Sequence, residues 1–198
     1  MGAGKSAKND LAKPDRADRQ ELILDAVIRL LAAEGISGVS IRSVGREAGV
    51  AHGLVSYYFD DKVGLISAAL RRIEAEDVAL VAPEPGSDPE ERLRTALRRV
   101  ADPEFLTTAY LSLRLQLWSL ANASTEYERL NSVAQRRYRD GLAELIEAAR
   151  PDLDPSECAR RAADINVVQN GLWLTTLLGL DQDSIERAVQ RCEHLAFS

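Results

Sequence analysis

The chain has 198 residues, of which 45% are hydrophobic and 28% charged, which is typical of a globular protein with one or two packed units. Its net charge of −6 does not by itself suggest nucleic-acid binding. Because no apolar run is long enough to span a bilayer, no secretory signal is present, and Cys158 and Cys192 follow no metal-ligand spacing, we expect a cytoplasmic protein without membrane segment, metal or cofactor.

The first 17 residues are polar and lysine-rich, and we expect a mobile tail there. A helix is predicted over residues 18–34, because apolar residues recur at helical spacing along one face. Those residues are Leu22, Ile23, Ala26, Val27, Leu30 and Leu31. Gly35 is expected to end this helix.

Residues 40–62 read as two short helices joined by a tight turn. Ser40 is a suitable N-cap for the first, whereas Glu47 lies too late to complete a capping box. Gly49 follows Ala48 at the point where a positive φ would end that helix. A second helix of about two turns is predicted over 51–58, and such a pair is typical of a helix-turn-helix.

In that motif the second helix enters the major groove of DNA. Its outward residues here are predicted to be His52, Gly53, Ser56 and Tyr57. Lys62 would lie in the first turn of the next helix, where an ammonium group and free N–H groups together suit a phosphate. Core packing is the alternative for the aromatic cluster; it is left open for Tyr58, and Phe59 is expected to be buried.

The pattern REAGV-x-x-G-x-x-x-x-YF-x-x-K, which starts at Arg46, resembles the DNA-binding domain of TetR-family transcriptional regulators. The resemblance covers about residues 18–75 and implies DNA contacts from Arg42, His52, Gly53, Ser56, Tyr57, Tyr58 and Lys62. It also makes Arg16 a candidate for the minor groove. Ala51 replaces the usual Ser or Thr cap, Ser56 a common Tyr, and Gly45 an Ala, the last at an intrinsic cost of roughly 1 kcal/mol.

The remainder is helical in period, and we predict an all-α fold of about nine helices. The further helices are expected at 62–80, 89–101, 104–122, 126–150, 155–179 and 183–196, the last beginning at Asp183. The predicted organisation is a tail (1–17), a helix-turn-helix DNA-binding domain (18–62) and a helical ligand-binding and dimerisation domain (63–198).

The helix around 162–178 is apolar on nearly all sides, which requires that it be covered on all sides. We expect a second subunit to cover one side, with the last helix completing a four-helix interface. The resemblance implies the same pair of helices. The predicted interface residues are Ile165, Val168, Leu172, Leu177, Ile185 and Val189.

Aromatic and polar residues interleave between the bridging and dimer helices, as in a small-ligand pocket of a helical bundle. The candidates are Tyr110, Arg114, Trp118, Tyr127, Asn166, Asn170 and Trp173. Segments 115–121 and 170–179 resemble the choline-sensing, BetI-like branch of the family, which implies an aromatic cage formed by Trp118 and Trp173. The alternative is that both tryptophans are core or interface residues.

These features favour a homodimeric regulator that binds double-stranded DNA at a palindromic operator, most simply a repressor released by an unknown small-molecule effector. An activator, or a regulator without effector, is the alternative. A helical enzyme or carrier is disfavoured, because the only histidines, His52 and His194, lie in unrelated segments and no catalytic residues are expected.

Overall fold

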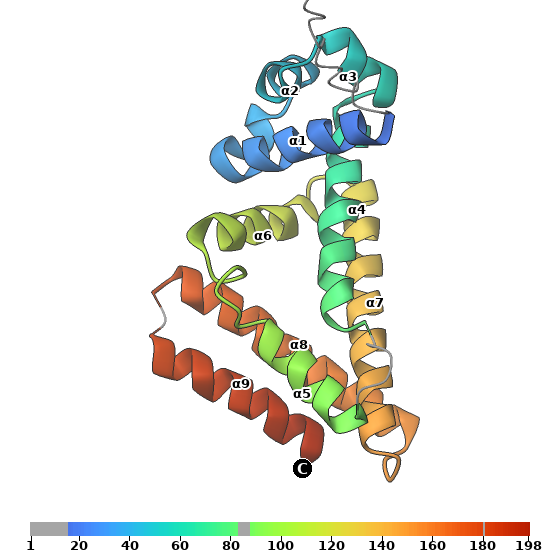
Figure 1. Ribbon diagram of the computed structural model, residues 1–198, viewed down its shortest axis with the longest axis vertical. Coiled ribbons are helices and arrows are strands. Elements are labelled where there is room, and N and C mark those ends of the chain that lie inside the picture. Colours follow the sequence, from blue (N-terminus) through green and yellow to red (C-terminus); the bar gives the residue numbers. More distant parts are fainter. Residues whose placement is uncertain (1–15, 83–87, 180) are drawn as a thin grey trace, which may run out of the picture.

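The computed structural model describes residues 16–82, 88–179 and 181–198, which form helices and turns and no strand. The helices are α1 (Arg16–Gly38), α2 (Ile41–Ala48), α3 (His52–Tyr58), α4 (Lys62–Leu80), α5 (Pro89–Arg99), α6 (Thr108–Leu120), α7 (Thr125–Ala149), α8 (Pro155–Leu177) and α9 (Gln182–Phe197). The elongated molecule carries α1–α3 at one end, and α8 and α9 lie at the other (Figure 1). The predicted all-α class is confirmed.

Side-chain caps explain most of the helix starts. Ser40 caps α2, and Ser43 rather than Glu47 completes a capping box with it. Asp181 caps α9, so the last helix begins before the predicted Asp183. Thr107 caps α6, and the prediction of a helix from residue 104 was wrong because backbone hydrogen bonds of turns occupy residues 101–106.

Gly35 interrupts α1 as predicted, although the helix resumes to Gly38. Its backbone has φ 68° and ψ −167°, a conformation that only glycine adopts without strain. The resulting kink turns the last residues of α1 toward α2, and Ser43 Oγ donates a hydrogen bond to the carbonyl of Gly38 at 2.7 Å. This hydrogen bond links the end of α1 to the first turn of α2.

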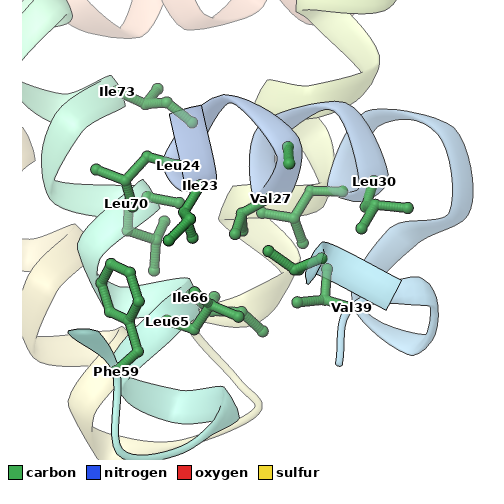
Figure 2. Packing of buried hydrophobic residues seen from close by; sticks show 14 of the residues in the cluster. Ile23, Leu24, Val27, Leu30, Val39, Phe59, Leu65, Ile66, Leu70 and Ile73 are labelled. Atoms are coloured by element: carbon green, nitrogen blue, oxygen red, sulfur yellow. The ribbon is translucent and has the colours of Figure 1, made fainter. Parts of the chain in front are cut away.

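The first of two cores lies beneath the helix-turn-helix. Residues of α1, α3 and α4 meet there, and Figure 2 shows Phe59 beside Leu65 and Leu70, with Ile73 at the other end of the cluster near Leu24. Leu113, Leu117 and Leu120 of α6, together with Tyr127 and Leu130 of α7, complete this core. The C-terminal half of the chain thus packs directly against the helices at the N-terminal end.

The second core joins α5, α7, α8 and α9 and receives Leu80 and Val81 at the end of α4. Helix α4 therefore contributes to both cores, its first half to one and its last turn to the other. Between these two stretches its buried stripe carries Asp77, one helical turn beyond Ile73. No helix in the described part of the chain is long and apolar enough to cross a membrane.

Candidate DNA-binding surface and effector cavity

Two buried side chains, Val55 and Phe59, anchor α3 to the core. Val55 is fully buried and Phe59 is 6% exposed. Gly49 ends α2 with φ 68°, so the chain turns sharply into α3. At Gly45 an added Cβ would lie 3.1 Å from the carbonyl oxygen of Val50, so glycine permits the close approach of α2 to this turn.

The predicted DNA contacts on the outer side of α3 are accessible. His52, Gly53, Ser56 and Tyr57 are all exposed, and Tyr57 is 68% exposed. Arg42 of α2 is exposed as well. Ala51 provides no side-chain cap to α3. Helix α3 thus presents to solvent a start without a side-chain cap and the exposed ring of Tyr57.

Two other predicted DNA contacts, Tyr58 and Lys62, form hydrogen bonds within the chain. Tyr58 is half-buried and its hydroxyl donates to the carbonyl of Arg16 at 3.4 Å. The Arg16 guanidinium lies 5.8 Å from the Tyr57 ring and 5.9 Å from the Tyr58 ring. Lys62 Nζ donates to the carbonyl of Ile36 at 2.6 Å. The start of α1 is thereby bonded to the end of α3, and the start of α4 to the end of α1. The lysines of the N-terminal segment, Lys5, Lys8 and Lys13, lie outside the described residues.

A small cavity of about 20 Å³ lies between α4, α6, α7 and α8. Its walls are unusually polar for a bundle interior. They are formed by Asp77, Arg114, Ala134, Gln135, Tyr138, Asn166, Gln169, Asn170 and Trp173. A volume of this size accommodates about one water molecule, so the walls are nearly in contact with one another.

The cavity is dominated by an ion pair between Arg114 and Asp77, whose side chains are 6% and 13% exposed. Tyr110 also donates to Asp77, at 3.2 Å. Burial alone would lower the pKa of Arg114, yet the carboxylate of Asp77 holds it above its usual value. The cation and its partner join α6 to α4 in the interior.

Hydrogen bonds order the remaining walls. Tyr138 donates to Gln169 Oε1 at 2.8 Å, and Asn166 donates to Gln135 Oε1 at 3.1 Å. Burial raises the pKa of Tyr138, which stays protonated. Trp173 is 3% exposed and donates from its indole nitrogen to the carbonyl of Val100 at 2.8 Å.

Four of the predicted pocket residues, Arg114, Asn166, Asn170 and Trp173, line the cavity. Tyr110 and Trp118 flank it through Arg114. The prediction for Tyr127 was wrong, because that side chain is 3% exposed and belongs to the core beneath the helix-turn-helix.

The sequence reasoning missed Asp77, which lines the cavity. A signal was available, since Leu70, Ile73, Asp77 and Leu80 follow one another at helical spacing. A carboxylate on an otherwise apolar stripe has to find a partner in the interior. Its neighbour Glu74 is half-buried, and burial followed by the charge of Asp77 raises its pKa to about 7.

The predicted dimer interface needs a correction. Ile165, Leu172 and Ile185 are 0%, 3% and 6% exposed within the single chain, so they can contribute little to a partner. Val168, Leu177 and Val189 are partly buried against the same core or its edge. The apolar face that remains open on α8 consists of Val167, 71% exposed, Leu174, 40%, and Leu178, 76%.

The arrangement defines a class of protein: a two-part helical protein with a helix-turn-helix at one end and a polar cavity in its bundle. A family model described as "Bacterial regulatory proteins, tetR family" matches residues 23–69, and one described as "BetI-type transcriptional repressor, C-terminal" matches residues 89–196. The chain belongs to the TetR family of DNA-binding transcriptional regulators, and its C-terminal part is of the BetI type. Regulators of this family act as dimers and are not enzymes.

Relatives named "HTH-type transcriptional regulator BetI" share this organisation. The protein of Burkholderia thailandensis is 31% identical over 163 residues, covering 80% of this chain and 82% of the relative. That of Paraburkholderia phymatum is 29% identical over 180 residues, covering 88% and 89%. The similarity therefore extends through both halves of the molecule.

Solved structures show the same fold at lower identity. A putative transcriptional regulator from Pseudomonas aeruginosa PAO1 superposes with a TM-score of 0.79 at 22% identity, over 95% of this chain and 94% of that one. A putative transcriptional regulator from Saccharomonospora viridis in complex with choline superposes with a TM-score of 0.69 at 22% identity, over 90% and 95%.

Proposed function

We propose that this regulator is a homodimeric repressor whose grip on a palindromic operator is released by a small-molecule effector that binds between α4, α6, α7 and α8. The observation that carries the proposal is the position of α4. Its first residue, Lys62, contacts the reading half, whereas Asp77 lines the cavity. One rigid helix thus joins the two sites.

The proposed operator contacts are Arg42, His52, Gly53, Ser56, Tyr57, Tyr58 and Lys62. Base edges would be met by the exposed side chains of α3, and phosphates by Lys62 and the backbone at Gly53. A palindrome is expected because two recognition helices about 34 Å apart match one turn of DNA. The functional division we propose is residues 18–62 for DNA reading and 63–198 for effector binding and dimerisation.

For the dimer we propose the open face of α8, with α9 beside it. Val167, Leu174 and Leu178 recur at helical spacing on the exposed side of α8. A second copy placed on this face would bury large apolar side chains that a single chain leaves in water. Val189 would lie at the edge of the same contact.

Helix α6 supplies a second route from the cavity to the DNA. Arg114 faces the cavity, while Leu113 and Leu117 of the same helix lie in the core beneath the helix-turn-helix. An effector that moves the walls apart would therefore shift the base on which α1 rests. To release the operator by a factor of about 100, it must favour the released state by about 2.7 kcal/mol.

The test is a gel shift with DNA from upstream of the protein's own gene, repeated over a range of salt concentrations. We expect sequence-specific binding that weakens steeply with salt, because phosphate contacts release counterions. Effectors can be found by thermal shift, since a ligand that binds only the folded chain raises its melting temperature. Binding that depends on neither DNA sequence nor salt would reject the proposal.

A regulator without effector, or an activator, is the second candidate, and the small volume of the cavity favours the former. Deleting the gene separates the outcomes, because loss of a repressor raises expression of its target and loss of an activator lowers it. One structural neighbour holds choline, but likeness at 22% identity shows the fold alone. The chemistry of an effector for this chain must therefore come from its own side chains.

A further inference from the structure

An aromatic cage is present beside the cavity, and it already contains a cation. The Arg114 guanidinium lies 4.5 Å from the ring centroid of Trp173, 5.7 Å from that of Trp118 and 5.9 Å from that of Tyr110. These distances fall within the range of cation–π attraction. The three rings therefore surround a positive charge that belongs to the protein itself.

The occupant is held firmly. Arg114 is paired with Asp77, and the whole residue is 5% exposed. With a cavity of about 20 Å³ beside it, the cage has no room for a quaternary ammonium group unless the arginine leaves. Expelling the arginine would move a guanidinium that three aromatic rings stabilise, a cost that a ligand bound beside the arginine does not incur.

The buried polar atoms at the cavity that lack a hydrogen-bond partner among the described residues are both donors. They are Nε of Arg114 and Nε2 of Gln169. A buried donor without an acceptor destabilises the folded chain. A ligand that supplies acceptor oxygens would recover this cost, whereas a quaternary amine has no acceptor to offer.

The approach to the cavity carries positive charge. A surface groove of about 380 Å³ runs between α4 and α7 and is lined by Arg71, Arg129 and Arg137 together with Glu74. Ala134 lines both this groove and the cavity. Arg71 and Arg129 are both paired with Glu126, at 3.4 and 3.0 Å, whereas Arg137 has no ion pair with a described residue. Arg137 is therefore the guanidinium that can attract an anion into this groove.

We propose that Arg114 fills the aromatic cage as a built-in cation, so that the site rejects quaternary amines and binds an effector bearing a carboxylate. The inference rests on the proposed effector role of the cavity. The cavity has room for about one water molecule, so the carboxylate would enter past Ala134 only as Asp77 moves away, and the rest of the effector would lie in the groove between α4 and α7. The carboxylate would then take the place of Asp77 on the guanidinium and accept a hydrogen bond from Gln169. Because Asp77 belongs to α4, its displacement loosens the tie between α4 and α6.

The test compares two probes of matched skeleton, phenylacetate and benzyltrimethylammonium, at constant ionic strength. Melting temperature and tryptophan fluorescence of the full-length protein are the readouts, since Trp118 and Trp173 border the guanidinium. Phenylacetate and other aromatic or alkyl monocarboxylates should raise the melting temperature of the wild type, and benzyltrimethylammonium should leave it unchanged.

Two variants separate the cage from its occupant. In Arg114→Ala the cage is vacated beside Asp77, so carboxylate binding should weaken roughly 10- to 100-fold and benzyltrimethylammonium should now stabilise the protein. Asp77→Asn keeps the cation and removes its internal competitor, so carboxylates should bind this variant more tightly than they bind the wild type. The second variant decides the matter if the first does not fold.

Stabilisation of the wild type by benzyltrimethylammonium would overturn the inference, and so would carboxylates that stabilise neither the wild type nor Asp77→Asn. The proposed function fails separately. Release of the operator by a quaternary amine would leave the repressor standing and reject the carboxylate site. Carboxylate binding without any effect on the gel shift would support the carboxylate site and reject effector release of the operator.

Discussion

Replacing Asp77 by Asn should destabilise the protein far more than removal of a surface ion pair. The change leaves the Arg114 guanidinium in the interior without its counter-charge, while shape is nearly conserved. Both side chains are largely buried, at 13% and 6% exposure. Removing one partner of a buried pair costs about 3–5 kcal/mol, and we expect that loss in the free energy of unfolding.

The pair can be separated from its setting by a double-mutant cycle. Arg114→Met removes the charge but keeps an unbranched side chain against Trp173. Because each single variant strands one polar group and the double variant Asp77→Asn with Arg114→Met strands no charge, the double should be more stable than the sum of the singles predicts. A coupling of at least about 2 kcal/mol is expected for groups in direct contact.

The assay is urea denaturation at 25 °C and pH 7, at one fixed protein concentration because the dimer contributes to stability. Arg29→Met is the matched control. It breaks the Arg29–Glu47 pair, whose side chains are 53% and 38% exposed, and exposed pairs contribute about 0–1 kcal/mol. An Asp77→Asn variant no less stable than this control, or additive losses in the double variant, would refute the reasoning.

Four further outcomes are expected. Tyr57→Ala should abolish operator binding in a gel shift without lowering the melting temperature, because the side chain is 68% exposed; unaltered binding would contradict its assignment. Leu178→Glu should shift the molar mass in light scattering toward the monomer, since that side chain is 76% exposed on the proposed dimer face; Leu174→Glu should act in the same direction. Ala51→Ser should stabilise the chain by about 0.5–2 kcal/mol by capping α3, which has no side-chain cap, with Ala51→Gly as the control in thermal melts. For Glu74 the folded pKa of about 7 exceeds the ordinary 4.5, so the folded chain retains a proton there and loses stability as pH rises from 4.5 to 7; Glu74→Gln should therefore gain on the wild type across that window, and melts with an equal difference at pH 5 and pH 8 would exclude this origin.

The helix-turn-helix could be predicted from the sequence because its signals are local. Ser40, Gly49 and Asp61 act on backbone within three residues of themselves, and the apolar spacing of the first helix specifies which face is buried. The burial of Phe59 was likewise predicted from the sequence, and the side chain is 6% exposed. Even there the capping box escaped prediction, because Ser43 performs a task for which a glutamate was sought.

The sequence indicated which helix carries an apolar face for the proposed dimer, but not which residues of that helix are exposed. Helix α8 is apolar on most sides, so its periodicity does not say which sides α6, α7 and α9 cover. Packing buries Ile165 and Leu172 inside the chain and leaves Val167 and Leu178 outside. That choice depends on where the other helices lie, which no local pattern reports.

The sequence by itself determined the order of the helices and the surface that α3 presents, because each depends on residues a few positions apart. Only the tertiary structure decided what the aromatic residues of the bundle enclose. Asp77 and Arg114 are 37 positions apart on different helices, and Trp173 is more distant still. Their meeting depends on how α4, α6 and α8 cross, and the burial of a charge in that crossing is a property of the assembled interior.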